Sequence, residues 1–131
     1  MIKLNLSQTD LGWIAGFLEG EGSFCKCGNT IMVCASQVQK EPLERLYQLL
    51  GGGINEYSSS NYIGNIIYRW CAYGPKAAEI MLEVYHLMSS KRKEQIKDTL
   101  LEWGNKPMIY IHGGYSLDER NVLNTAIFDL A

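Results

Sequence analysis

The sequence predicts an α+β fold in the order αββαββα, with a four-stranded antiparallel sheet, helices on one of its faces, and further helices at the C-terminal end. Segments in which apolar and polar residues alternate come in pairs, and only turn-forming residues separate the members of each pair. Segments with helical spacing stand between the pairs. With 131 residues, of which 47% are hydrophobic and 20% charged, we expect a single domain over 1–131, comprising a core of 7–103 and an extension of 104–131.

The first helix is expected to begin after Ser7 and to run to about Gly20. Ser7 followed by Asp10 is typical of a capped helix start. Gly12, Gly16 and Gly20 recur every fourth residue and therefore fall near one stripe of the helix. Each glycine costs a helix about 1 kcal/mol relative to alanine, so the stripe indicates close approach of a second backbone, from another copy or from within the chain.

Two strands are expected next, from Ser23 to Asn29 and from Thr30 to Gln39, with the turn at Gly28 and Asn29. Alternation in the second strand predicts which side chains lie under the helices and which lie on the open face. The side chains expected under the helices are those of Ile31, Val33 and Ala35. Those expected on the open face are Met32, Cys34 and Ser36.

The later elements follow the same logic. A second helix is bracketed by Pro42 and Gly51, two strands cover 54–58 and 66–73, and a third helix runs over 76–88 after Pro75. A fourth helix capped by Ser90 ends at Gly104, and a tail helix over 117–130 follows a capping box. The capping-box residues are Ser116 and Glu119.

Composition narrows the classes of protein. The chain has no apolar run long enough to cross a bilayer and no signal-peptide segment at its start, so an intracellular location is expected, in the cytoplasm or an organelle matrix depending on the encoding genome. The four cysteines are then expected to be reduced thiols. Without a CxxC pair or a nearby histidine, neither a zinc site nor a disulfide framework is expected.

The net charge of −2 counts against tight phosphate binding, because nucleic-acid-binding proteins normally carry a basic surface. The charges are unevenly distributed along the chain. No acidic residue occurs from Gly22 to Lys40, whereas acids outnumber bases from Ala77 onward. We therefore expect a neutral-to-basic sheet and an acidic opposite side.

The segment Ile14 to Gly22 reads Ile-Ala-Gly-Phe-Leu-Glu-Gly-Glu-Gly. It resembles the motif that names the LAGLIDADG homing endonucleases, and the element order over roughly the first 103 residues also resembles that family. The resemblance implies a saddle-shaped sheet and a site-specific endonuclease that cuts double-stranded DNA with Mg²⁺ or Mn²⁺. One copy of the motif implies a homodimer acting on a long pseudo-palindromic target.

The resemblance also implies roles for particular residues. Glu21 matches the metal-binding acid, helped by the carbonyl of Gly20, and hard oxygen ligands of this kind suit Mg²⁺. Gln39 matches a residue that orients the attacking water, although a solvated residue at a strand end is an equal alternative. Lys91 matches a basic residue near the active site. Lys91, Arg92 and Lys93 oppose the dipole of the fourth helix, which fits either an approaching phosphate or a plain surface charge run.

Two binding surfaces are also expected, one for a second copy of the chain and one for DNA. The interface between copies is assigned to Gly12, Trp13, Ala15, Gly16, Glu19 and Gly20. DNA binding is assigned to Ser23, Cys25, Cys27, Asn29, Thr30, Met32, Cys34, Ser36, Lys40, Arg69 and Arg92. Arginine can pair bidentately with guanine, which favours Arg69 for base recognition. The sulfur-containing residues would contact thymine methyl groups, or else they indicate a register displaced by one residue.

Two other functions remain open at this stage. One is an RNA-binding intron maturase with the same fold. The other is a non-catalytic module that binds DNA or another protein.

Overall fold

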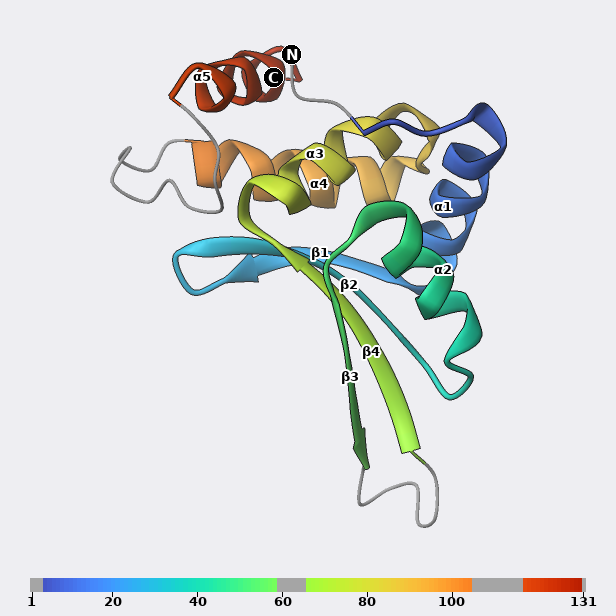
Figure 1. Cartoon of the computed structure of the whole chain (residues 1–131). Coiled ribbons are helices and arrows are strands. Elements are labelled where there is room, and N and C mark those ends of the chain that lie inside the picture. Colours follow the sequence, from blue (N-terminus) through green and yellow to red (C-terminus); the bar gives the residue numbers. More distant parts are fainter. Residues whose placement is uncertain (1–3, 59–65, 105–116, 131) are drawn as a thin grey trace.

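The computed structural model describes residues 4–58, 66–104 and 117–130 (Figure 1). The elements in chain order are α1 (Gln8–Glu21), β1 (Gly22–Cys27), β2 (Thr30–Gln37), α2 (Glu41–Leu50), β3 (Gly53–Ser58), β4 (Ile66–Tyr73), α3 (Gly74–Val84), the 3-10 turn η1 (Tyr85–Leu87), α4 (Ser90–Gly104) and α5 (Leu117–Phe128). The predicted αββαββα order with additional C-terminal helices is confirmed.

The sheet has the strand order β1-β2-β4-β3, and every neighbouring pair is antiparallel. The helices lie on one side of this sheet and leave the other side uncovered, while α5 lies beyond α3 and α4 (Figure 1). The far ends of β3 and β4 project past the helical layer as a two-stranded arm (Figure 1). The predicted α+β architecture is therefore correct.

One hydrophobic core joins the helices to the covered face of the sheet. Ile14 and Leu18 of α1, Trp70 of β4 and Ile80 of α3 are all fully buried in it. Ile127 of α5 belongs to the same cluster, so the last helix packs on the core. Among the described residues no helix is long and apolar enough to cross a bilayer.

The ends of several elements differ from the expectation. β2 ends at Gln37, two residues before Gln39, and α3 ends at Val84, where the chain tightens into η1 before reaching Met88. α4 begins at Ser90, so this serine is the first residue of the helix and not its cap. The side chains of the expected capping box, Ser116 and Glu119, lie outside the described residues.

The junction between α1 and β1 is sharp. The Ser7 hydroxyl accepts the amide of Asp10 at 3.1 Å, which confirms the capped start of α1. The helix ends at Gly22, whose N–H donates to the carbonyl of Leu18. A Cβ on Gly22 would lie 2.6 Å from the Leu18 oxygen, so glycine is required where the helix turns directly into the strand. Glu21 is thereby held as the last helical residue.

Candidate active site and nucleic-acid interface

The glycine stripe of α1 lies on the surface. Gly12, Gly16 and Gly20 are exposed, and a Cβ built on any of them would meet no heavy atom of the described chain within 4 Å. No described segment therefore packs against the stripe, which removes the internal-neighbour explanation for that part of the chain. Ala15 differs, because it is 4% exposed and belongs to the core. Its role in the interface between copies stays a prediction.

Trp13 lies beside the stripe and is tied to α2. Its ring stacks on Phe17 with centroids 5.3 Å apart, and the guanidinium of Arg45 lies 4.1 Å from its centroid. Arg45 also pairs with Asp10 of α1 at 3.5 Å. These contacts hold α1 and α2 together and leave the glycine stripe of α1 unobstructed.

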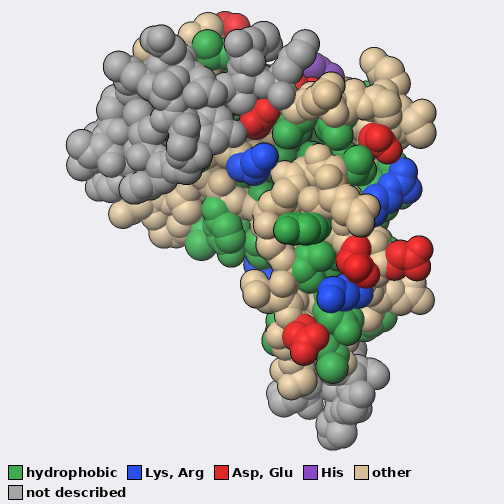
Figure 2. All heavy atoms as spheres, in the orientation of Figure 1, with side chains coloured by type: hydrophobic (Ala, Val, Ile, Leu, Met, Phe, Trp, Pro, Cys, Tyr) green, Lys and Arg blue, Asp and Glu red, His purple; other side chains and the backbone are tan. Residues whose placement is uncertain are grey.

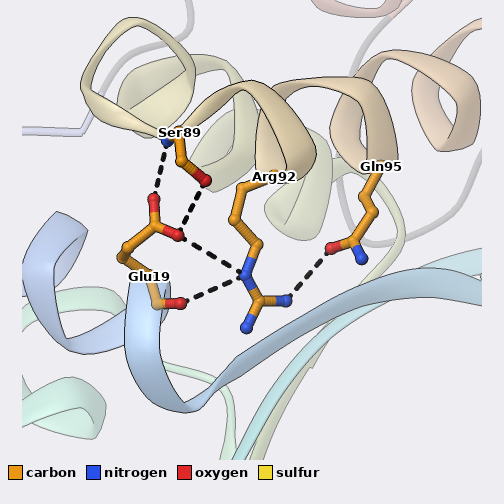
Figure 3. A network of polar contacts seen from close by, with 4 residues as sticks. All are labelled: Glu19, Ser89, Arg92 and Gln95. Atoms are coloured by element: carbon orange, nitrogen blue, oxygen red, sulfur yellow. Dashed lines mark hydrogen bonds and ion pairs between the residues drawn. The ribbon is translucent and has the colours of Figure 1, made fainter.

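Glu19 joins the end of α1 to the start of α4 (Figure 3). Its carboxylate accepts the Ser89 amide at 2.7 Å and the Ser89 hydroxyl at 2.9 Å. Hydrogen bonds from the backbone and then the hydroxyl of Ser89, followed by attraction to Arg92, lower the pKa of Glu19. A carboxylate is favourable at a helix N-terminus, so this one offsets the unfavourable placement of the cations in the first turn of α4.

Arg92 strengthens the same junction. Its Nε donates to the main-chain oxygen of Glu19 at 3.1 Å, and its Nη1 donates to Gln95 at 3.0 Å (Figure 3). The guanidinium also lies 5.9 Å from the centroid of the Phe24 ring. The side chain is therefore engaged within the chain, next to Gly20 and Glu21. A DNA-binding role for Arg92 stays a prediction.

Glu21 itself is exposed at the C-terminal end of α1. No group of three or more His, Cys, Asp or Glu side chains in the described part of the chain is placed to hold a metal ion. Mg²⁺ usually keeps several waters and takes one or two carboxylates together with substrate phosphates. Glu21 and Gly20 are both exposed residues, and a carboxylate together with a backbone carbonyl suits that incomplete donor set.

The open face of the sheet has the register expected from the sequence. Ser23, Cys25 and Cys27 of β1 stand opposite Cys34, Met32 and Thr30 of β2. Residues of β2 that alternate with these, such as Ile31 and Val33, are fully buried under the helices. The alternative of a register displaced by one residue is therefore wrong, and Asn29 lies in the turn between the two strands.

A small second cluster lies on this open face. Met32, Cys34 and Cys71 are buried at 8%, 6% and 7% exposure, and Cys25 packs against them. Arg69 lies over the cluster, because its Nη2 donates to the sulfur of Cys34 at 3.2 Å and to that of Met32 at 3.9 Å. The contact with Cys34 raises the pKa of the Arg69 guanidinium. Sulfur atoms thus line the middle of the uncovered face, and Arg69 covers part of them.

Comparison with known proteins bears on the fold alone. No protein-family model and no curated protein matches the sequence. Among solved structures, the homing endonuclease I-CvuI in complex with its target Sro1.3 in the presence of 2 mM Ca is similar, with a TM-score of 0.53 and 14% identity over 94% of this chain and 95% of that one. The chain has the LAGLIDADG homing-endonuclease fold.

Two further solved structures are similar. I-CvuI in complex with the I-CreI target C1221, in the presence of 2 mM Mg and with DNA not cleaved, gives a TM-score of 0.50 at 14% identity over 94% of this chain and 95% of that one. The archaeal intron-encoded I-Vdi141I complexed with DNA gives 0.47 at 17% identity over 93% and 96%. In the LAGLIDADG fold of this chain, α1 carries the motif residues, and both Glu21 and the glycine stripe belong to that helix.

In this LAGLIDADG fold, Gln39 lies beyond the end of β2, the strand in which it was expected. It lies in the connection from β2 to α2 and lines a surface hollow of about 690 Å³ between α1 and α2, together with Trp13 and Arg45. Ser36 is closer in register to the acidic end of α1, because it follows Ala35, the partner of Gly22, and stands opposite Arg69. The role of Gln39 stays a prediction.

The side chains of Lys91, Lys40 and Lys26 lie in different surroundings. Lys91 is exposed at the start of α4, whereas the Nζ of Lys40 lies 5.6 Å from the centroid of the Tyr68 ring. Lys26 pairs with Glu102 of α4 on the covered side of the sheet. In Figure 2, acidic and basic side chains are interspersed with hydrophobic ones, and the described residues on the face drawn form no continuous basic surface.

Sequence reasoning missed several residues of the LAGLIDADG sheet that share the open face. Asn55 stands opposite Arg69, and Tyr57 opposite Ile67, in the β3–β4 ladder. Cys71 and Tyr73 of β4 stand opposite Cys34 and Met32. The alternation that identified Arg69 would have identified Cys71 and Tyr73, because they follow it at steps of two.

Proposed function

We propose that the chain is a site-specific endonuclease that hydrolyses phosphodiester bonds of double-stranded DNA. It acts as a homodimer on a long pseudo-palindromic target, with Mg²⁺ or Mn²⁺ at its active sites. The observation that carries the proposal is the exposed glycine stripe of α1, which leads along the helix to an exposed carboxylate at Glu21.

The exposed glycines of α1 support the proposed homodimer. Two copies of the helix related by a two-fold axis bring their glycine stripes together, and without Cβ atoms the two backbones approach closely. Gly20 belongs to that stripe, so the adjoining Glu21 of each copy comes to lie near the axis. One chain supplies a single such acid, and the dimer supplies one for each DNA strand.

The chemistry assigned to the site depends on oxygen donors. Glu21 and the carbonyl of Gly20 hold the divalent ion, which stabilises the attacking and leaving oxygens when bound. Glu19 and Arg92 hold the end of α1 against α4, through the Ser89 contacts at 2.7 and 2.9 Å and the Arg92 contact at 3.1 Å. They therefore fix the end of the helix from which the Glu21 side chain extends. Lys91, exposed on α4, supplies positive charge to a phosphate.

DNA lies along the uncovered face of the sheet. The side chains there alternate with the buried ones, so they can contact base edges without disturbing the core. Arg69 is the first candidate for a bidentate contact with guanine. The net charge of −2 means that affinity comes from local contacts more than from a general attraction to phosphates.

Glu21→Gln tests the assignment. The variant keeps the size of the side chain and removes its charge, so DNA binding should persist while Mg²⁺-dependent cutting of a randomised duplex library is lost. The matched control is Glu83→Gln on α3, at the groove facing α5, which should cut like the parent. A Glu21→Gln protein that cuts as well as the parent would refute the role of this acid.

The same library separates the other two functions. A parent protein that retains duplexes with Mg²⁺ but leaves them uncut is a binding module. A parent that shifts structured intron RNA and ignores the duplexes is a maturase. Either result refutes the nuclease proposal.

A further inference from the structure

Two thiols face each other at the centre of the open face. Cys34 of β2 and Cys71 of β4 are direct partners in the antiparallel ladder, and their side chains share one buried cluster. Both are free cysteines, exposed by only 6% and 7%. Burial raises the pKa of the Cys71 thiol, and the shared cluster places this thiol beside Cys34.

The ladder geometry permits a bond between them. Directly opposite residues of antiparallel strands have Cα atoms about 4.5 or 5.5 Å apart, and disulfides span Cα separations of about 4.4–6.8 Å. Partners in register also project their side chains to the same face. A disulfide between the two strands therefore needs rotation of the side chains and only small movement of the backbone.

The surroundings favour thiol chemistry over metal binding. In the part of the chain that the structure describes, no three cysteine, histidine or acidic side chains are grouped to hold a metal ion. The guanidinium of Arg69 lies 3.2 Å from the sulfur of Cys34, and a cation beside a sulfur favours attack by that sulfur on an oxidant. Cys71 is the direct ladder partner of Cys34 and shares its buried cluster, so its thiol is placed to attack the oxidised Cys34 sulfur.

We propose that Cys34 and Cys71 are a reversible redox pair that a peroxide converts into a disulfide on the DNA-facing side of the sheet. Cys34 attacks the peroxide, forming a sulfenic acid and releasing one water when the peroxide is hydrogen peroxide. The Cys71 thiol then attacks that sulfur and releases a second water. The two thiols together lose two electrons and two protons, which hydrogen peroxide takes up as it is reduced to two molecules of water.

The bond acts on DNA through Arg69, and this step rests on the proposed function. In the reduced protein the guanidinium is oriented by Cys34 and Met32. Oxidation draws the Cys34 sulfur toward β4 and removes the thiol that the guanidinium contacts. A well-placed arginine–guanine pair is worth a factor of about five or more in affinity, so the oxidised protein should bind its duplex at least about fivefold more weakly.

The chemical test uses Cys25→Ser/Cys27→Ser, which keeps only the proposed pair. After hydrogen peroxide, its intact mass should fall by two hydrogen atoms, and trypsin should yield peptides 27–40 and 70–76 joined until a thiol reductant separates them. The matched control, Cys34→Ala/Cys71→Ala, retains Cys25 and Cys27 and should show no such linkage. If peptides 27–40 and 70–76 stay separate in the first variant while the fold is intact, the proposal is overturned.

The functional test measures duplex binding by the parent protein when reduced, oxidised and reduced again, with Cys34→Ala/Cys71→Ala as the control whose binding should not change on oxidation. A fall of about fivefold or more that the reductant reverses supports regulation, and unchanged or tighter binding by the oxidised protein overturns it. If the reduced protein binds no duplex while the peptides are joined, the redox pair stands and the proposed nuclease function fails.

Discussion

Replacing glycines of the α1 stripe by alanine should have opposite effects on the single chain and on the dimer. We expect Gly12→Ala/Gly16→Ala to stabilise the monomer, because the added Cβ atoms meet no described heavy atom within 4 Å. Two glycine-to-alanine changes inside a helix contribute about 2 kcal/mol together. For a chain of this size, that raises the Tm of the monomer by roughly 6–10 °C.

The same methyl groups should prevent two helices from meeting. In a two-fold dimer four additional methyl groups enter the contact, and overpacking costs about 1–3 kcal/mol at each site. Even a total of about 4 kcal/mol would weaken association roughly a thousandfold. Cleavage of both DNA strands should then be lost at protein concentrations where the parent is dimeric.

Sedimentation velocity over a dilution series, with urea unfolding at the same concentrations, separates the two effects. Asp98→Ala is the matched control, because it raises helix propensity at an exposed position of α4 and should leave association unchanged. A double-alanine protein that dimerises as tightly as the parent would refute the assignment of the stripe. Loss of monomer stability would show that another segment packs against these glycines.

Two further predictions concern stability. The pKa of Glu19 in the folded protein lies below its ordinary value of 4.5, so the stabilisation that Glu19 supplies is complete above that pH and is lost as the pH falls through the lower folded-state pKa. Urea unfolding from pH 7 downward should therefore show a smaller loss of unfolding free energy for Glu19→Gln than for the parent. Equal losses would contradict this prediction. Gly52→Ala should destabilise the folded protein by more than about 1–2 kcal/mol, because φ is +86° and the new Cβ would lie 2.5 Å from the Cys71 carbonyl oxygen. The control is Gly53→Ala, whose Cβ would meet nothing within 4 Å. An unchanged unfolding curve for Gly52→Ala would contradict the prediction and show that this turn can relax.

Local patterns predicted the architecture well. Alternation in β2 correctly separated Ile31 and Val33 from Met32 and Cys34, because side chains of a strand point to opposite faces in turn. The glycine spacing correctly placed Gly12, Gly16 and Gly20 on one helix, α1. Both signals come from neighbouring residues, so a single sequence contains them completely.

The sequence alone did not predict contacts between residues that are far apart along the chain. Ser89 binds Glu19 from 70 residues away, and nothing in either local sequence indicates the other. The burial of Cys34 likewise depends on Cys71 and on Arg69 of another strand. The position of Gln39 was misjudged because β2 ends two residues early, which carries this residue to the hollow between α1 and α2.

The uncovered face of the sheet has a consequence for how such a protein diversifies. Under the proposed function, side chains for recognition and side chains for folding alternate along the same strands, so a mutation at Ser23, Ser36 or Asn55 would change the surface offered to a target while leaving the hydrophobic interior as it is. New specificities can therefore accumulate at little risk to folding. The sulfur-lined centre is the exception, since substitutions there alter both properties together.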